Sequence, residues 1–169
     1  MDATIWIRHL PGSPWTRGSG LLAGAAAGAA GTTALNAVTY VDMAVRGRPT
    51  SSTPEDTVEK LSELAHVPIP GRGATRNNRI EGLAPLTGLG AGVGIGAVLG
   101  LVRAAGFRPP PVITVVAATV GALIGTNGPM TVLGITDPRT WALKDWVSDI
   151  VPHVAYGIVA AWVLEGLDH

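Results

Sequence analysis

Charged residues are absent from four long stretches of the chain. The stretches cover residues 18–41, 82–102, 109–136 and 150–164. A helix of a soluble protein carries charge on its wet face, so this segregation indicates apolar helices separated by polar connections. Three of the stretches reach the roughly 20 residues that cross the hydrocarbon core of a bilayer. The fourth is shorter and spans only if Asp149 and Glu165 lie at its two interfaces or are covered by neighbouring helices.

The pattern predicts an all-α polytopic membrane protein. We expect one integral membrane domain over residues 1–169, built as a four-transmembrane-helix bundle with spans at about 20–45, 83–104, 112–134 and 148–166. The first span is rich in alanine and glycine, which suits burial among other helices. A signal peptide is the alternative for this span, because Arg8 and Arg17 precede the apolar run. The run continues to Val45 without a clean cleavage site, which favours the span.

The polar connection 46–82 is expected to contain one short amphipathic helix. Thr53 and Pro54 are typical of a helix start, acidic residues follow in the first turn, and Pro68 ends the pattern. We expect this helix to lie on the membrane surface, with docking of a soluble partner as the alternative. Segment 71–80 is basic and without apolar anchors, so we expect it near anionic headgroups.

The composition of the chain argues against several classes of function. Lys plus Arg and Asp plus Glu each number 12, and this zero net charge argues against nucleic-acid binding. The chain has no cysteine, which excludes disulfides, zinc–thiolate sites and cysteine nucleophiles. We find no cofactor motif and expect neither a cofactor nor a metal centre. The lipid bilayer is the expected partner.

The distribution of Lys and Arg predicts the orientation. The two connections 46–82 and 135–147 hold eight of these residues, and the other side holds four: Arg8, Arg17, Arg103 and Arg108. The positive-inside rule therefore places both connections in the cytoplasm and both termini outside. We expect a multi-pass protein of a bacterial plasma (inner) membrane.

Glycines recur at helical spacing in the first two spans. The candidate packing residues are Gly24, Gly28, Gly88, Gly92, Gly96 and Gly100. Small residues four apart form a flat ridge on which helix backbones approach closely, as in a glycine zipper. We favour packing of the first span against the second within one chain. A homo-oligomer or a larger membrane complex is the alternative.

Five polar side chains within the spans form the candidate polar or proton site: Asn36, Asn127, Asp149, His153 and Tyr156. Unpaired polar groups are costly in hydrocarbon, so each needs a partner. Asp149 and His153 are four residues apart and share a helix face, where a carboxylate orients an imidazole. A hydrogen-bonded structural cluster and a proton-handling site both fit this pattern. Asp145 lies one turn before Asp149 on the same face, and the three side chains could ligate a metal, but a clear fourth ligand is lacking.

In the last third of the chain, Gly134-Ile135-Thr136-Asp137-Pro138 is followed by Trp146, Asp149 and His153. This region resembles the YagU-like family of small bacterial inner-membrane proteins. The loop Arg46-Gly47-Arg48-Pro49 is similar to that of related actinobacterial membrane proteins. The resemblance implies a multi-pass inner-membrane protein and implies no activity.

Two functions remain open from the sequence. The first is a structural, accessory or assembly component that packs through its glycine ridges. The alternative is a small transporter or channel, possibly proton-linked, with its polar site near the third and fourth spans. An enzyme is a distant third, because no Ser-His-Asp order or paired-histidine haem motif is present.

Overall fold

The computed structural model describes residues 14–167 of the chain, and their side chains from residue 17 on. This part contains five α-helices and one 3-10 helix: α2 (Pro14–Arg46), α3 (Thr53–Ala65), α4 (Ala74–Ala104), α5 (Pro111–Val132), η1 (Pro138–Thr140) and α6 (Leu143–Gly166). No strand occurs among the described residues. The predicted all-α architecture is confirmed.

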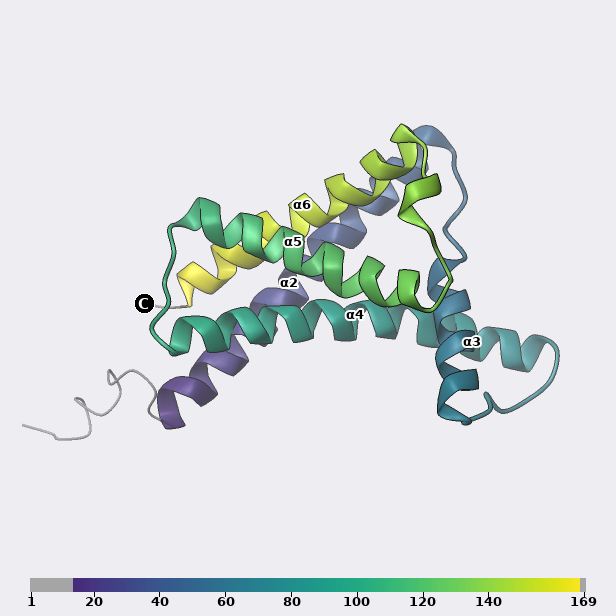
Figure 1. The fold of residues 1–169 in the computed structure, drawn as a ribbon, viewed down its shortest axis with the longest axis horizontal. Coiled ribbons are helices and arrows are strands. Elements are labelled where there is room, and N and C mark those ends of the chain that lie inside the picture. Colours follow the sequence, from purple (N-terminus) through teal and green to yellow (C-terminus); the bar gives the residue numbers. More distant parts are fainter. Residues whose placement is uncertain (1–13, 168–169) are drawn as a thin grey trace, which may run out of the picture.

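The four long helices alternate in direction and form one bundle (Figure 1). α2 packs most extensively against α4 and α6, while α5 packs against α6 and, less closely, against α4. The connections 47–73 and 133–142 lie at one end of the bundle together with α3, and this end is called the α3 end below. The short turn 105–110 lies at the opposite end.

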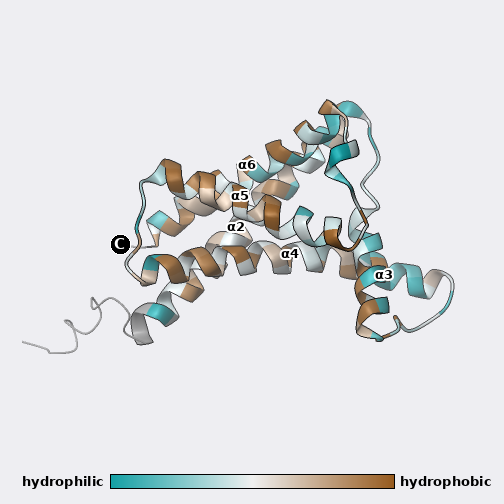
Figure 2. Cartoon of the chain, viewed as in Figure 1, coloured by the Kyte–Doolittle hydropathy of each residue, from teal (hydrophilic) through white to brown (hydrophobic). Residues whose placement is uncertain are grey.

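All four long helices are long and apolar enough to cross a membrane, counting α2 from Arg17 to Arg46. Figure 2 shows the hydrophilic residues gathered in α3 and in the connections at the α3 end. In hydrocarbon a helix satisfies its own backbone groups, which is why apolar segments of this length fold as helices. This architecture is consistent with a multi-pass helical membrane protein.

α4 begins earlier than the sequence indicates. The expected start was residue 83, but the helix starts at Ala74 and is roughly 46 Å long at 1.5 Å per residue. Ile80 and Ala84 are buried against Val58 of α3, and Arg76 pairs with Glu59 at 2.6 Å. The expectation that segment 71–80 has no apolar anchor was wrong, because Ile80 anchors it to α3.

The other helix ends differ by smaller amounts. α2 covers the expected span 20–45 and extends beyond it at both ends, and α5 ends at Val132 rather than at residue 134. α6 begins at Leu143 rather than at 148, because the Asp145 carboxylate accepts a hydrogen bond from the Ala142 backbone N–H at 3.1 Å and caps the first turn. Arg8, which contributes to the expected orientation, lies outside the described residues.

η1 is held by a local ion pair in the connection before α6. The Asp137 carboxylate accepts hydrogen bonds from the Arg139 side chain and from the Arg139 backbone N–H. These contacts, the side-chain bonds first, hold the pKa of Asp137 below its usual 3.8. The turn is thereby fixed in a tight conformation between α5 and α6.

The core of the bundle is made mostly of small side chains. Ala118, Ala122, Tyr156 and Ala160 form its buried centre, with Leu35 among the residues packed around it. Tyr156 is the one large side chain of that centre, and it is 1% exposed. Small residues let the helices approach closely, and dispersion contacts between close backbones stabilise bundles in lipid.

Candidate functional site

A hydrogen-bonded polar cluster joins α5 to α6 near the α3 end. The Asn127 side-chain N–H donates to Asp149 Oδ2 at 2.7 Å, and Thr126 Oγ1 lies 3.2 Å from His153 Nε2. Asp149 and His153 are one helical turn apart on α6, and His153 Nδ1 lies 3.5 Å from Asp149 Oδ1. We refer to these four residues as the polar cluster. Each of its side chains has a partner within it.

The contacts of the imidazole determine which nitrogen carries a proton. Nδ1 of His153 lies 2.7 Å from the Asp149 backbone oxygen and faces the Asp149 carboxylate. Both neighbours are acceptors, so Nδ1 carries the proton and donates it. Nε2 faces Thr126 Oγ1, which can donate or accept. The same Thr126 hydroxyl lies 2.9 Å from the Ala122 backbone oxygen and 3.4 Å from that of Leu123, so its single hydrogen has acceptors on its own helix as well as on His153.

The polar cluster is largely enclosed by protein. The His153 side chain is 9% exposed and the Asp149 side chain is 19% exposed. On the side away from the α3 end, the buried Tyr156, Ala118 and Ala122 form an apolar layer. Water can therefore approach the cluster more readily past Asp149, from the α3 end, than through the rest of the bundle.

Two prolines interrupt the backbone hydrogen bonds beside the cluster. Pro129 lies inside α5, and Pro152 lies inside α6 next to His153. A proline has no N–H, so the carbonyls of Gly125 and Ser148 lack their usual helical donors. The cluster is thus flanked by backbone acceptors on both of its helices. α5 continues through Pro129 to Val132.

Three of the five predicted residues meet in this cluster, and the other two lie elsewhere. Asn127, Asp149 and His153 come together. Tyr156 instead donates from its hydroxyl to the Gly92 backbone oxygen of α4 at 2.7 Å. Asn36 is exposed on α2, does not meet Asn127, and forms no hydrogen bond with any residue that the structure describes.

Sequence reasoning missed Thr126. A threonine in a helix commonly bonds a carbonyl of its own helix, as Thr126 also does here, so nothing in its type alone points to a partner on another helix. Its position directly before Asn127, in a span already carrying a candidate polar residue, was the available signal.

A second polar group ties α2 to α6 at the α3 end. Asp42 pairs with Arg46, one helical turn later, at 2.5 Å and with Arg48 at 2.6 Å. Arg46 also donates to Ser148 Oγ on α6 at 2.5 Å. The first turns of α6 are therefore held by α2 through Ser148 and by α5 through Asp149.

The glycines of α2 and α4 face one another. A methyl group placed on Gly24 would meet the backbone oxygen of Gly96, and one on Gly28 would meet that of Gly92. Gly100 lies against Gly24 in the same way, with a distance of 2.8 Å from its added Cβ to the Gly24 Cα. Gly88 takes no part in this contact, since nothing lies within 4 Å of its added Cβ. Five of the six candidate glycines therefore lie at an interface inside the chain.

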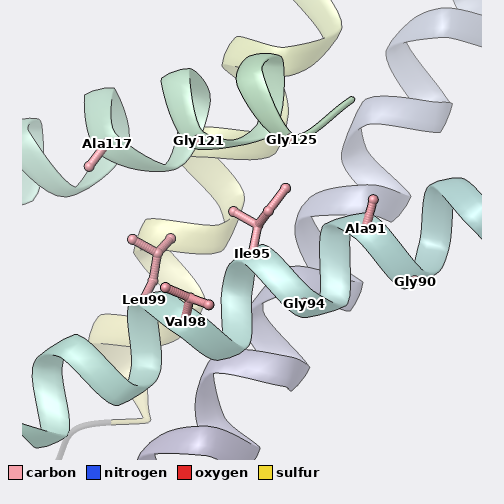
Figure 3. A pocket seen from close by; sticks show the side chains of 9 residues that line it. All are labelled: Gly90, Ala91, Gly94, Ile95, Val98, Leu99, Ala117, Gly121 and Gly125. Atoms are coloured by element: carbon pink, nitrogen blue, oxygen red, sulfur yellow. The ribbon is translucent and has the colours of Figure 1, made fainter. Parts of the chain in front are cut away.

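An apolar groove opens between α4 and α5 (Figure 3). Its volume is about 420 Å³. Ile95 and Leu99 project from α4 toward α5, and small residues make up most of the walls: Gly90, Ala91, Gly94, Ala117, Gly121 and Gly125. The groove is lined by hydrocarbon and backbone, and none of its lining residues belongs to the polar cluster.

The fold and the site define an all-α bundle with four helices long and apolar enough to cross a membrane and a polar cluster at one end. Within residues 14–167, no three His, Asp or Glu side chains come together in a way that would hold a metal ion. No protein-family model, no curated protein and no solved structure matches this chain.

Proposed function

We propose that the protein is a small proton-linked transporter or channel whose proton site is the polar cluster of α5 and α6. One observation carries this proposal: the contacts of His153 satisfy its hydrogen-bonding groups with or without a second proton. A buried polar group usually loses a hydrogen bond when its protonation changes, and that loss is costly in a low-dielectric interior. Here the Thr126 hydroxyl can either donate to His153 Nε2 or accept from it, so His153 keeps this hydrogen bond in both protonation states.

The two states differ in the direction of a single hydroxyl. In neutral His153, Nε2 accepts from the Thr126 O–H. In charged His153, Nε2–H donates to Thr126 Oγ1, and the hydroxyl hydrogen turns to the Ala122 oxygen 2.9 Å away. The Asp149 carboxylate lies 3.5 Å from His153 Nδ1, and the Asn127 side-chain N–H donates to that carboxylate. Proton binding and release therefore need no helix movement.

A proton-flux assay tests the proposal. The purified protein is reconstituted in liposomes, and a potassium diffusion potential drives protons past a trapped pH dye. We expect flux in the natural protein and loss of flux in His153→Gln and Thr126→Val. Thr114→Val is the matched control, because Thr114 lies on the same helix and its hydroxyl contacts only a backbone oxygen. Flux at the level of empty liposomes in the natural protein would overturn the proposal.

A second candidate function is a structural or accessory role in a membrane assembly, and the groove between α4 and α5 favours it. The glycine zipper of α2 and α4 is used within the chain, whereas the small residues of the groove are open to a partner helix. Gly94→Leu fills the groove, and no atom lies within 4 Å of its added Cβ. This variant should lose co-purifying partners, and Gly88→Leu, outside the groove on the same helix, should retain them.

We further propose that the protein belongs to a bacterial plasma membrane with the α3 end in the cytoplasm. The excess of Lys and Arg in the connections at that end supports this orientation. The resemblance to YagU-like proteins supports the same membrane. Because the chain has no cysteine, Ser51→Cys and Ala105→Cys report the two ends separately. In intact cells a membrane-impermeant maleimide should label Ala105→Cys and spare Ser51→Cys, and the reverse pattern would invert the orientation.

A further inference from the structure

α2 presents an outer face unlike the outer faces of α5 and α6. Between Leu22 and Tyr40, no large hydrophobic side chain of this described stretch is exposed. The exposed residues there are Ala26, Thr33, Asn36 and Ala37. α5 and α6, in contrast, expose branched side chains along their lengths: Ile113, Val116, Val120, Ile124, Ile150 and Ile158. A small and partly polar face is better suited to contact with another helix than to contact with lipid.

Asn36 is the strongest feature of this face. It lies ten residues before Arg46, about 15 Å along the helix, and so within the span. Its amide has no hydrogen-bond partner among the described residues, whereas the neighbouring Thr33 hydroxyl donates to the Ala29 backbone oxygen at 3.0 Å. Lipid chains offer neither donors nor acceptors, so an amide at this depth requires a polar partner from outside the chain.

Asn36 also lies on a regular stripe along α2. Residues that follow at alternating spacings of four and three form the seam of a pair of supercoiled helices. The stripe consists of Leu22, Ala26, Ala29, Thr33, Asn36, Tyr40 and Met43. None of these residues is buried within the chain. The opposite face of α2 carries the glycine contact with α4, so the stripe is free for a second helix.

We propose that this stripe binds a second copy of the same chain, with the two Asn36 amides facing each other across a two-fold axis along the membrane normal. All copies insert in one orientation, so Asn36 lies at the same depth in each. An amide has both donors and an acceptor, and two identical amides satisfy each other through reciprocal hydrogen bonds. A two-fold interface pairs each residue with its own equivalent near the axis. The proposal is independent of the proton site.

Single cysteines test the dimer directly, because the natural chain has none. Thr33→Cys places a thiol on the stripe, one turn from Asn36. Val120→Cys is the control, because Val120 is 45% exposed at membrane depth on α5. The full-length protein is oxidised in its native membranes with copper phenanthroline. We expect Thr33→Cys to form a disulfide-linked species of twice the chain mass, and Val120→Cys to remain single.

A change at Asn36 then tests the amide pair. Asn36→Val in the Thr33→Cys background should weaken association about tenfold, measured as the crosslinked fraction on dilution with lipid, and Asn36→Gln should restore part of it. Three results would overturn the proposal: equal crosslinking of the two cysteine variants, crosslinking of Thr33→Cys to a different protein, or a crosslinked fraction unchanged by Asn36→Val. If Asn36→Val does not fold, the comparison of the two cysteine variants still decides.

Discussion

A methyl group at Gly96 should separate α2 from α4. In Gly96→Ala, the new Cβ would lie 2.5 Å from the Cα of Gly28 and 2.6 Å from its backbone nitrogen, where ordinary contact begins near 3.4 Å. The obstructing atoms are backbone and cannot rotate away. The helices must therefore move apart by roughly 1 Å, and a gap of that size forfeits a quarter to a half of each neighbouring dispersion contact.

The size of the effect follows from two opposing contributions. Overpacking a close contact costs about 1–3 kcal/mol. Replacing glycine by alanine in a helix returns up to about 1 kcal/mol of intrinsic helix stability. We expect Gly96→Ala to lower the free energy of unfolding by about 1–2 kcal/mol. Gly88→Ala, on the same helix with open space around its Cβ, should leave the free energy unchanged or raise it by up to about 1 kcal/mol.

The opposite signs of the two changes make the assay decisive. Unfolding of the purified protein in mixed detergent micelles is followed by helical circular dichroism as the fraction of sodium dodecyl sulfate rises. The transition of Gly96→Ala should come earlier than that of the natural protein, and the transition of Gly88→Ala should not. If both variants unfold at the same detergent fraction, α2 and α4 are not in backbone contact at Gly96.

Three further predictions follow from other contacts. Tyr156→Phe removes the hydrogen bond from the hydroxyl to the Gly92 backbone oxygen and should lower the free energy of unfolding by about 0.5–1.5 kcal/mol in the same assay. An unchanged free energy of unfolding would mean that the hydroxyl does not form this hydrogen bond. Val58→Ala should release α3 from α4, seen as faster amide hydrogen exchange over residues 53–65 with the spans unchanged. Arg139 lowers the pKa of Asp137, so this ion pair stabilises the turn fully at pH values above the ordinary pKa of an aspartate. The stabilisation is lost as the pH falls through the lowered pKa. Carboxyl-carbon NMR should show that Arg139→Ala returns the Asp137 midpoint toward 3.8.

The four spans were predictable because charge is costly in hydrocarbon, and its absence over some 20 residues leaves few alternatives to a membrane helix. The face shared by Asp149 and His153 was predictable for a similar reason, since residues four apart on a helix always lie close. Both predictions depend on a property of one helix alone. Neither requires knowledge of how the helices are rotated about their axes.

The features that the sequence did not reveal depend on how helices face one another. The first turns of α4 look polar along the chain, and only docking of Val58 against Ile80 makes them part of a helix. Asn36 and Asn127 are both amides in membrane spans. Rotation of α2 directs Asn36 outward, whereas Asn127 meets Asp149. Thr126 became visible as a site residue only once α6 brought His153 beside it.

The close contact of α2 with α4 bears on the order in which the protein is assembled during synthesis. These helices are consecutive spans, so their contact can form as soon as α4 has left the ribosome and entered the membrane. α5 and α6 form a second consecutive pair, held by hydrogen bonds between side chains in addition to the close approach of Gly157 to the backbone of α5. Tyr156, the large residue of the core, then joins the pairs by reaching Gly92 from α6. The biogenesis of the bundle is thus the docking of two hairpins, each stabilised by its own chemistry before the two meet.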